Sequence, residues 1–286
     1  MKAKLLSVIM AVLLPVIIMA QNDIYQSEKF VKIWEVKGLS VPESVLPVPA
    51  EGIMYVSNIG VNNPTEKEGK GFISILTLDG KIKNLKWCTG LNSPKGMAIS
   101  GDKLFVTEVD RVAEIDLKTG QKIKDYPVEG AVFLNDIAAE KNGALYISDS
   151  RTGTIHRLKD GVVSVFIRSD DFPNPNGVVF KKDMLLLGTG DKIVKIDPST
   201  KEVKDYRVNT GGVDGLAVVN NETVIFSDWP GKIHIMNAGE EKELLLDTSS
   251  TEMLKTADFG YESNKKLVYI PTFFGNSVVC YKLELD

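Results

Sequence analysis

The amino-acid sequence predicts an all-β fold, a six-bladed β-propeller whose blades are four-stranded antiparallel sheets. Three observations support this prediction. One short phrase recurs six times along the chain at a spacing near 40 residues, each copy is followed by further short apolar segments, and helical periodicity is nearly absent. Repeats of about this length, with four short strands and turn residues between them, are typical of propellers.

The recurring phrase is a segment that leads into the first strand of each repeat. Its equivalent positions, here called the slot, are 52, 40, 41, 38 and 43 residues apart. The long first spacing contains GVNNPTEKEGKG (60–71), which we interpret as an insertion of polar and turn-forming residues. The six copies are VPESVLPV (41–48), SPKGMAIS (93–100), FLNDIAAE (133–140), NPNGVVFK (174–181), GVDGLAVV (212–219) and KTADFGYE (255–262), and their slot residues are Glu43, Lys95, Asn135, Asn176, Asp214 and Ala257.

Each copy is followed by segments that we expect to be the second, third and fourth strands. The second strands are apolar, as in KLFVTE (103–108) and TVIFSD (223–228), and the third alternate, as in VAEIDLKTG. Alternation of apolar and polar residues is the pattern of a half-buried strand. Runs such as IKDYPV and VKDYRV between the copies complete each four-stranded unit.

The last repeat supplies only three strands before the chain ends. The missing fourth is available near the start, in FVKIWEVKG (30–38), so we expect this segment to close the sixth blade and remove an open sheet edge. Cys88 and Cys280 then lie in neighbouring blades, and two separate buried thiols are favoured over a disulfide, which the sequence leaves open.

Residues 1–20 have the features of a secretory signal peptide. Lys2 and Lys4 precede an apolar run that ends at Ala20, so we expect cleavage there and export to the periplasm or beyond. A membrane anchor is the alternative, but Pro15 interrupts the run, which is shorter than the roughly 20 residues of a membrane span. Residues 21–286 are then a single propeller domain with no further span.

Composition and charge narrow the range of partners. The net charge of −4 becomes −6 when Lys2 and Lys4 are removed with the signal peptide, and the sequence contains no basic stripe. An acidic surface argues against nucleic acid or anionic lipid as a partner. We therefore expect a small-molecule substrate or ligand, and a protein partner remains open.

The slot positions converge on the central channel, because the first strand of each blade lines it. Carboxylates at Glu43 and Asp214 and amides at Asn135 and Asn176 form a set of oxygen donors suited to a hard cation such as Ca²⁺. Mg²⁺, Mn²⁺ and Zn²⁺ are the alternative cations for this site. Zinc is disfavoured because both histidines fall on third strands, away from the slot. A hydrated polar channel without metal is the other interpretation.

These residues resemble the gluconolactonase, senescence-marker-protein (regucalcin) and luciferin-regenerating family. The resemblance is carried by Glu43 in PESV, Asn135 in FLND, Asn176 in PNG and Asp214 in VDG, and it covers about residues 40–286. It implies a six-bladed propeller that holds a divalent cation in its channel and hydrolyses lactones or related esters. It further implies that Glu43, Asn176 and Asp214 are metal ligands, that Asn135 lies near metal and substrate, and that Asp214 is the catalytic base.

The sequence departs from the family pattern at two positions. Phe133 stands where lactonases of this family commonly have an arginine that would hold sugar hydroxyls, so a more apolar ligand than gluconolactone is expected. Lys95 adds a cation to the slot, where it could bind an anionic group of the substrate or pair with Glu43. Trp229, in the turn after a second strand, is a candidate pocket wall.

Two hypotheses follow. The first is an exported, divalent-metal-dependent hydrolase of a lactone or small ester, with metal and substrate at one mouth of the channel. Its site is Glu43, Asn135, Asn176 and Asp214 for the metal, Asp214 for catalysis, and Lys95, Phe133, Asn135 and Trp229 for the substrate. The second is a non-catalytic propeller that binds a small ligand or a protein on the same face. Fold alone cannot separate them, because propellers serve both purposes.

Overall fold

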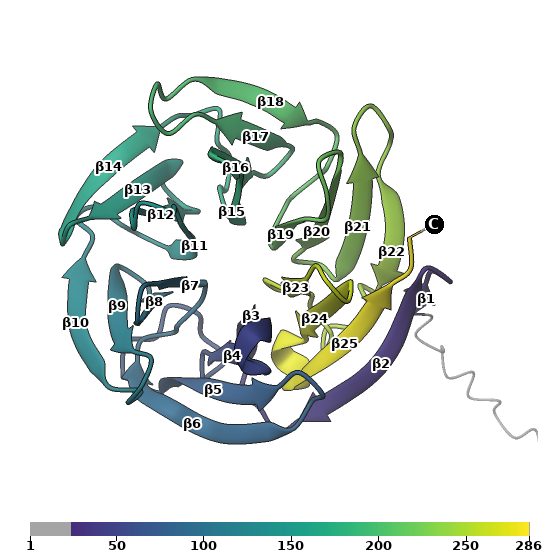
Figure 1. Cartoon of the computed structure of the whole chain (residues 1–286), viewed down its shortest axis with the longest axis horizontal. Helices are drawn as coiled ribbons and strands as arrows, with labels where there is room; N and C mark the ends of the chain where they lie inside the picture. Colours follow the sequence, from purple (N-terminus) through teal and green to yellow (C-terminus); the bar gives the residue numbers. More distant parts are fainter. Residues whose placement is uncertain (1–23, 286) are drawn as a thin grey trace, which may run out of the picture.

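The computed structural model describes residues 24–285 and shows six antiparallel sheets arranged in a ring around a central axis (Figure 1). The six-bladed propeller predicted from the repeats is therefore confirmed. The predicted signal peptide, residues 1–20, lies outside the described residues. Among the described residues, no helix is long and apolar enough to cross a membrane.

The first three blades follow the predicted order, with the innermost strand first. Blade 1 consists of β3 (Pro42–Val48), β4 (Ile53–Asn58), β5 (Gly71–Thr77) and β6 (Ile82–Leu91), with a 3₁₀ turn η1 (Pro49–Glu51) after β3. Blade 2 consists of β7 (Met97–Ser100), β8 (Lys103–Thr107), β9 (Arg111–Asp116) and β10 (Lys122–Pro127). Blade 3 consists of β11 (Leu134–Ala139), β12 (Leu145–Asp149), β13 (Thr154–Lys159) and β14 (Val162–Arg168).

Blades 4 to 6 complete the ring. Blade 4 consists of β15 (Val178–Lys181), β16 (Met184–Gly188), β17 (Ile193–Ile196) and β18 (Val203–Arg207). Blade 5 contains β19 (Leu216–Val218), β20 (Thr223–Asp228), β21 (Lys232–Asn237) and β22 (Glu243–Asp247). Blade 6 contains β23 (Gly260–Glu262), β24 (Leu267–Pro271), the 3₁₀ turn η2 (Phe273–Gly275) and β25 (Ser277–Leu283).

The N-terminal segment closes the ring as predicted. Strand β2 (Phe30–Lys37) pairs antiparallel with β25, with Phe30 opposite Leu283 and Lys37 opposite Ser277. The sequence analysis did not anticipate β1 (Tyr25–Gln26), which adds a fifth strand to blade 5 by pairing with β22. One short segment therefore pairs with two neighbouring blades and holds them together (Figure 1).

The hydrophobic core lies between neighbouring blades. The apolar cluster between blades 1 and 2, for example, joins Tyr55 and Ile73 to Leu104 and Ile115. Alternating residues of the second and third strands supply these contacts, as the period of two in the sequence requires. Cys88 and Cys280 are both buried and free, so the prediction of two separate thiols is confirmed. Burial raises their pKa values to about 11 and about 12.

Close packing around the axis explains the glycines that follow several slot residues. At Gly177, behind Asn176, an added Cβ atom would lie 2.4 Å from the backbone oxygen of Asp214 in the next blade. A side chain there would force the inner strands of blades 4 and 5 apart. Glycine at this position allows two slot residues of neighbouring blades to come together.

Candidate functional site

A cavity of about 260 Å³ opens at one mouth of the central channel. All seven residues that the sequence analysis proposed for the site line this cavity. Five further residues complete the lining. The full set is Glu43, Lys95, Phe133, Asn135, Asn176, Asp214 and Trp229, with Ile59, Pro64, Ser150, Asn174 and Phe273 in addition.

Serines on the second strands fix the backbone at three of the slots. The Ser57 hydroxyl accepts a hydrogen bond from the backbone N–H of Ser44 at 3.0 Å, immediately after Glu43. The Ser148 and Ser227 hydroxyls accept in the same way from the residues that follow Asn135 and Asp214, at 3.0 and 2.7 Å. Each bond satisfies a buried backbone donor where the inner strand begins, and thereby fixes the direction of the slot side chain.

The acidic side of the cavity consists of Glu43, Asn176 and Asp214. The amide nitrogen of Asn176 donates to Asp214 Oδ1 at 2.5 Å, which joins blades 4 and 5. Two oxygens, Glu43 Oε2 and Asn176 Oδ1, are buried and have no hydrogen-bond partner among residues 24–285. An unpaired buried polar atom costs free energy. These atoms are therefore candidates for contact with a ligand.

Burial makes both carboxylates of this group reluctant to ionise. It raises the pKa of Glu43 well above the usual value, and the negative charges of Asp214 and Asp258 add to the effect. Burial and the charge of Asp258 raise the pKa of Asp214 to about 7, although the hydrogen bond from Asn176 opposes the shift. A cation that binds here would relieve this repulsion.

Asn135 lies on the blade 3 side of the cavity. Its amide nitrogen donates to the Ser150 hydroxyl at 3.1 Å, and that hydroxyl in turn donates to the backbone oxygen of Pro175 at 2.8 Å. Ser150 thus orients the Asn135 amide and ties blade 3 to the loop that carries Asn176. The sequence analysis did not identify Ser150, although it directly follows the SD pair of blade 3.

Lys95 is the cationic residue of the cavity, and only 1% of it is exposed. Its ammonium group donates to the backbone oxygen of Ser93 at 3.1 Å and lies 4.5 Å from the centroid of the Phe133 ring. The guanidinium of Arg151, at the surface, lies 4.8 Å from the same centroid. Burial lowers the pKa of Lys95 to about 8, and the charges of Glu43 and Glu108 oppose that shift.

Two aromatic residues form an apolar wall. Trp229, which is 43% exposed, packs edge-on against Phe273, with ring centroids 4.7 Å apart. The sequence analysis proposed Trp229 but missed Phe273. Both follow a second strand, β20 and β24 respectively, so the repeat register contained the signal for the second residue as well.

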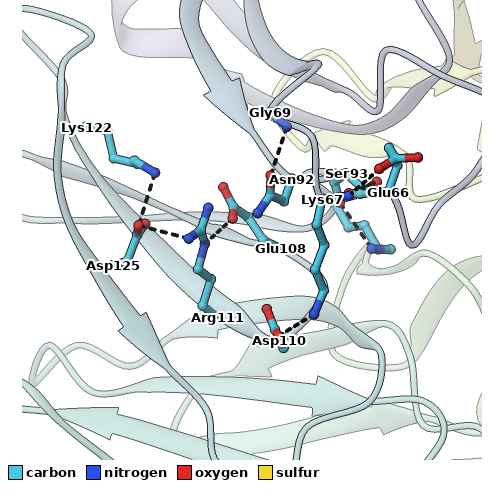
Figure 2. Close-up of polar contacts among 11 residues, drawn as sticks. Glu66, Lys67, Gly69, Asn92, Ser93, Glu108, Asp110, Arg111, Lys122 and Asp125 are labelled. Atoms are coloured by element: carbon cyan, nitrogen blue, oxygen red, sulfur yellow. Dashed lines mark hydrogen bonds and ion pairs between the residues drawn. The ribbon is translucent and has the colours of Figure 1, made fainter.

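The insertion 60–71 is anchored beside the cavity and contributes Pro64 to its wall. Figure 2 shows Lys67 directed toward Asp110, with which it forms an ion pair at 2.5 Å. The backbone N–H of Gly69 donates to Asn92 Oδ1 at 3.0 Å, and the Ser93 hydroxyl donates to the backbone oxygen of Glu66 at 2.9 Å (Figure 2). These contacts make the insertion a wall of the site.

The carboxylates of the two SD pairs serve turns. Asp149 accepts hydrogen bonds from the backbone N–H groups of Val132, Phe133 and Arg151. Asp228 accepts from the backbone of Gly231 and Lys232. Neither carboxylate lines the cavity. Their effect on the site is indirect, since Asp149 fixes the backbone of Phe133.

Two buried carboxylates that the sequence analysis missed lie one residue beyond a slot. Asp136 follows Asn135 and Asp258 follows Ala257, and both line the hollow of about 510 Å³ that is the other end of the channel. Because successive residues point to opposite sides at the entrance of a strand, the register could have predicted this placement. Burial raises the pKa of Asp136 to about 7 and that of Asp258 well above its usual value.

The donor set restricts what kind of cation the cavity could hold. Across residues 24–285, no group of three or more His, Cys, Asp or Glu side chains has an arrangement that could hold a metal ion. A site at the cavity would therefore depend on amide oxygens as well as on Glu43 and Asp214. The unpartnered Asn176 Oδ1 and Glu43 Oε2 fit that requirement, and such oxygen donors suit Ca²⁺ better than softer metals.

The similarity of this chain to known proteins is a similarity of fold. No protein-family model matches the chain, and no curated protein matches its sequence. A solved gluconolactonase from Xanthomonas campestris superposes with a TM-score of 0.66 and 14% identity, over 86% of this chain and 87% of that one. A streptogramin B lyase superposes with a TM-score of 0.62 and 15% identity, over 91% and 98%.

A third structure is a catalytically inactive virginiamycin B lyase from Staphylococcus aureus with quinupristin. It superposes with a TM-score of 0.60 and 15% identity, over 89% of this chain and 99% of that one. At such identities the likeness establishes architecture. The propeller of this chain is therefore similar in overall architecture to these three structures.

Proposed function

We propose that this protein is a divalent-metal-dependent hydrolase that opens a lactone or small ester in the cavity at one mouth of its channel. The observation that carries the proposal is the pair of buried, unpartnered oxygens, Glu43 Oε2 and Asn176 Oδ1, beside Asp214. These groups would hold the cation, for which Ca²⁺ is the first candidate. The gluconolactonase with the same fold supports this reaction class.

The residues of the cavity would share the work of hydrolysis. A bound divalent cation supplies Lewis acidity for the ester carbonyl. Asp214 has one oxygen held by Asn176 and a second oxygen that can accept the proton of the attacking water. Asn135, oriented by Ser150, would donate to or accept from the substrate next to the reacting bond.

The cavity walls favour a small and partly apolar substrate. Phe133, Trp229 and Phe273 supply aromatic surface, and Ile59 and Pro64 supply aliphatic surface. The volume of about 260 Å³ lies below the roughly 300–1,000 Å³ of pockets for drug-sized ligands. A single lactone ring with short substituents fits these properties better than a peptide or an oligosaccharide.

A lyase reaction has less support. The S. aureus virginiamycin B lyase is inactive when one histidine is replaced by alanine. In this chain, His156 and His234 are buried on third strands, and neither lines the cavity. Export to the periplasm or beyond, proposed from residues 1–20, is compatible with either reaction. The alternative is the second hypothesis, a non-catalytic propeller that binds its ligand at this cavity. The experiment must distinguish it from the hydrolase.

The decisive experiment is an activity panel of neutral lactones, acidic lactones and aryl esters. The protein is stripped with a chelator and assayed before and after Ca²⁺ is restored, alongside Asp214→Asn. We expect turnover of at least one substrate that disappears on chelation, returns with Ca²⁺ and is lost in the variant. Turnover that is unaffected by both the chelator and the substitution would contradict the proposed metal-dependent mechanism, and no turnover of any substrate would favour the binding-protein hypothesis.

A further inference from the structure

Lys95 is buried in the cavity, and among the described residues no carboxylate oxygen lies within ion-pair distance of its ammonium group. In the part of the chain that the structure describes, its ammonium group has one hydrogen bond, to the neutral backbone oxygen of Ser93, and forms no ion pair. An ammonium group has three donors, so two of them have no partner there. A buried charge without pairing is costly and indicates either a structural compromise or a ligand.

The surroundings of Lys95 hold it in place. Ser93, whose backbone oxygen accepts from the ammonium group, has a φ of 48°, a conformation that side-chain-bearing residues seldom adopt. The same serine holds the insertion through its hydroxyl, which donates to the backbone oxygens of Asn63 and Glu66. Ser93 thus contacts both the lysine and the insertion that forms the wall of the cavity.

Positive charge gathers at this side of the cavity. Lys95 and Arg151 both lie over the ring of Phe133, at 4.5 and 4.8 Å from its centroid. The phenyl ring attracts cations weakly, but it cannot neutralise either charge. Lys95 belongs to blade 2 and Phe133 to blade 3, whereas Asn176 and Asp214 belong to blades 4 and 5. The cationic side therefore lies across the cavity from the Asn176–Asp214 pair.

A charge count identifies the missing group. If a divalent cation is bound as proposed above, it balances the two carboxylates of Glu43 and Asp214. The positive charge of Lys95 is then left over, and one negative charge on the ligand restores neutrality. A carboxylate supplies this single charge, whereas a phosphate brings up to two and would leave a net negative charge in the cavity.

We propose that Lys95 is a specificity-determining residue that binds a carboxylate of the ligand, so that the substrate is a lactone or small ester carrying a free carboxylic acid. This inference rests on the proposed function for the reacting bond. The carboxylate subsite itself stands on the burial, the lack of an ion pair and the position of Lys95. The acid lies against Lys95 and Phe133, and the ester faces Glu43, Asn176 and Asp214.

Binding of a non-reacting pair of ligands tests the subsite. The probes are tetrahydrofuran-2-carboxylate and its carboxamide, which have nearly the same shape and differ in charge. Calorimetry is performed on the full mature chain, stripped and in excess Ca²⁺. We expect the wild type to prefer the carboxylate by at least tenfold in Ca²⁺, and Lys95→Met to lose that preference. Lys95→Met removes a buried unpaired charge at similar length, so it should fold, which its melting temperature verifies.

Arg151→Met is the matched control, because it removes the exposed cation near the same ring. It should retain the preference for the carboxylate within about twofold. Equal loss in both variants would show a general positive field and overturn the subsite, as would a wild type that binds neither probe or does not distinguish them. If Lys95→Met does not fold, the comparison of the two probes on the wild type still decides.

The two proposals can fail separately. If the wild type prefers the carboxylate probe but turns over no lactone, the carboxylate subsite is supported and the hydrolase is refuted. Turnover of neutral lactones at least as fast as acidic ones, with no effect of Lys95→Met on KM, would leave the hydrolase standing and would refute the carboxylate subsite.

Discussion

Both ends of the central channel contain buried carboxylates, at slot positions at one end and one position beyond a slot at the other, yet the ends differ in how their buried polar groups are satisfied. At the end opposite the proposed site, Asp136 accepts from the backbone N–H groups of Ile137 and Val178, both at 2.7 Å. Asp258 accepts from the Ser44 hydroxyl at 2.5 Å. At the end with the proposed site, Glu43 Oε2 and Asn176 Oδ1 have no hydrogen-bond partner in the part of the chain that the structure describes.

This difference separates a structural role from a functional one. Asp136 links blade 3 to blade 4, and Asp258 links blade 6 to blade 1, so these carboxylates join neighbouring inner strands. The cavity end keeps polar atoms that the fold does not use. Buried polar groups are normally satisfied, and those that are not tend to mark sites of binding or chemistry.

The largest expected effect is a difference in kcat/KM between variants at the two ends of the channel. Glu43→Gln should lower kcat/KM for the best lactone at least 100-fold, because it removes a charge from the proposed cation site at nearly constant shape. Asp136→Asn should leave kcat/KM within a few-fold of the wild type. Steady-state kinetics with excess Ca²⁺ check both. Similar losses in the two variants would erase the distinction between the ends of the channel.

The next effect is stabilisation by the cation. Binding at 100 times Kd adds about 2.7 kcal/mol to the free energy of unfolding, which corresponds to a rise in Tm of roughly 5–10 °C for a chain of this size. We expect this rise for the wild type and for Asp136→Asn, and little or none for Glu43→Gln. Differential scanning fluorimetry in millimolar Ca²⁺ measures it, and an unchanged wild-type Tm would contradict the site.

A stability effect of smaller size should appear at the other end. Asp136→Asn replaces one of two acceptor oxygens with an NH₂ group, which leaves a backbone N–H of β11 or β15 unsatisfied. The expected loss is about 1–3 kcal/mol in the free energy of unfolding. Urea denaturation in the absence of Ca²⁺ measures it. A variant as stable as the wild type would mean that these bonds do not hold the blades together.

A further expected effect is a pH dependence of the stability of the metal-free protein. The pKa values of Asp136 and Asp214 are raised to about 7, so the folded state keeps protons that the unfolded chain has already lost above about pH 4. Stability without metal should therefore fall as the pH rises from about 4 to 7. Because these buried carboxylates interact, the pH dependence of stability reports on the group and not on one residue.

Bound Ca²⁺ should reduce or reverse this slope, because the cation binds the ionised carboxylates. Chemical denaturation at a series of pH values, with chelator and with Ca²⁺, gives both slopes. A metal-free stability that rises across the same range would contradict the assignment of protons to the buried carboxylates.

The sequence by itself determined the ring and its polar slot. A repeat near 40 residues with alternating strands allows few other folds, and the equivalence of Glu43, Asn135, Asn176 and Asp214 follows from that register. The closing segment 30–38 could also be predicted, since a three-stranded last blade leaves an edge to be paired. Local pattern suffices for these features because each repeat is a single supersecondary unit.

Only the tertiary structure decided how the polar atoms of different blades meet. Among residues 24–285, the absence of an ion pair at Lys95 depends on which side chains of other blades lie near it. The hydrogen bond from Asn176 to Asp214 and the edge-on packing of Phe273 against Trp229 each join different blades of the ring. So does the pairing of β1 with blade 5. The physical reason is that hydrogen bonding and burial depend on distances between blades, which a repeat pattern does not encode.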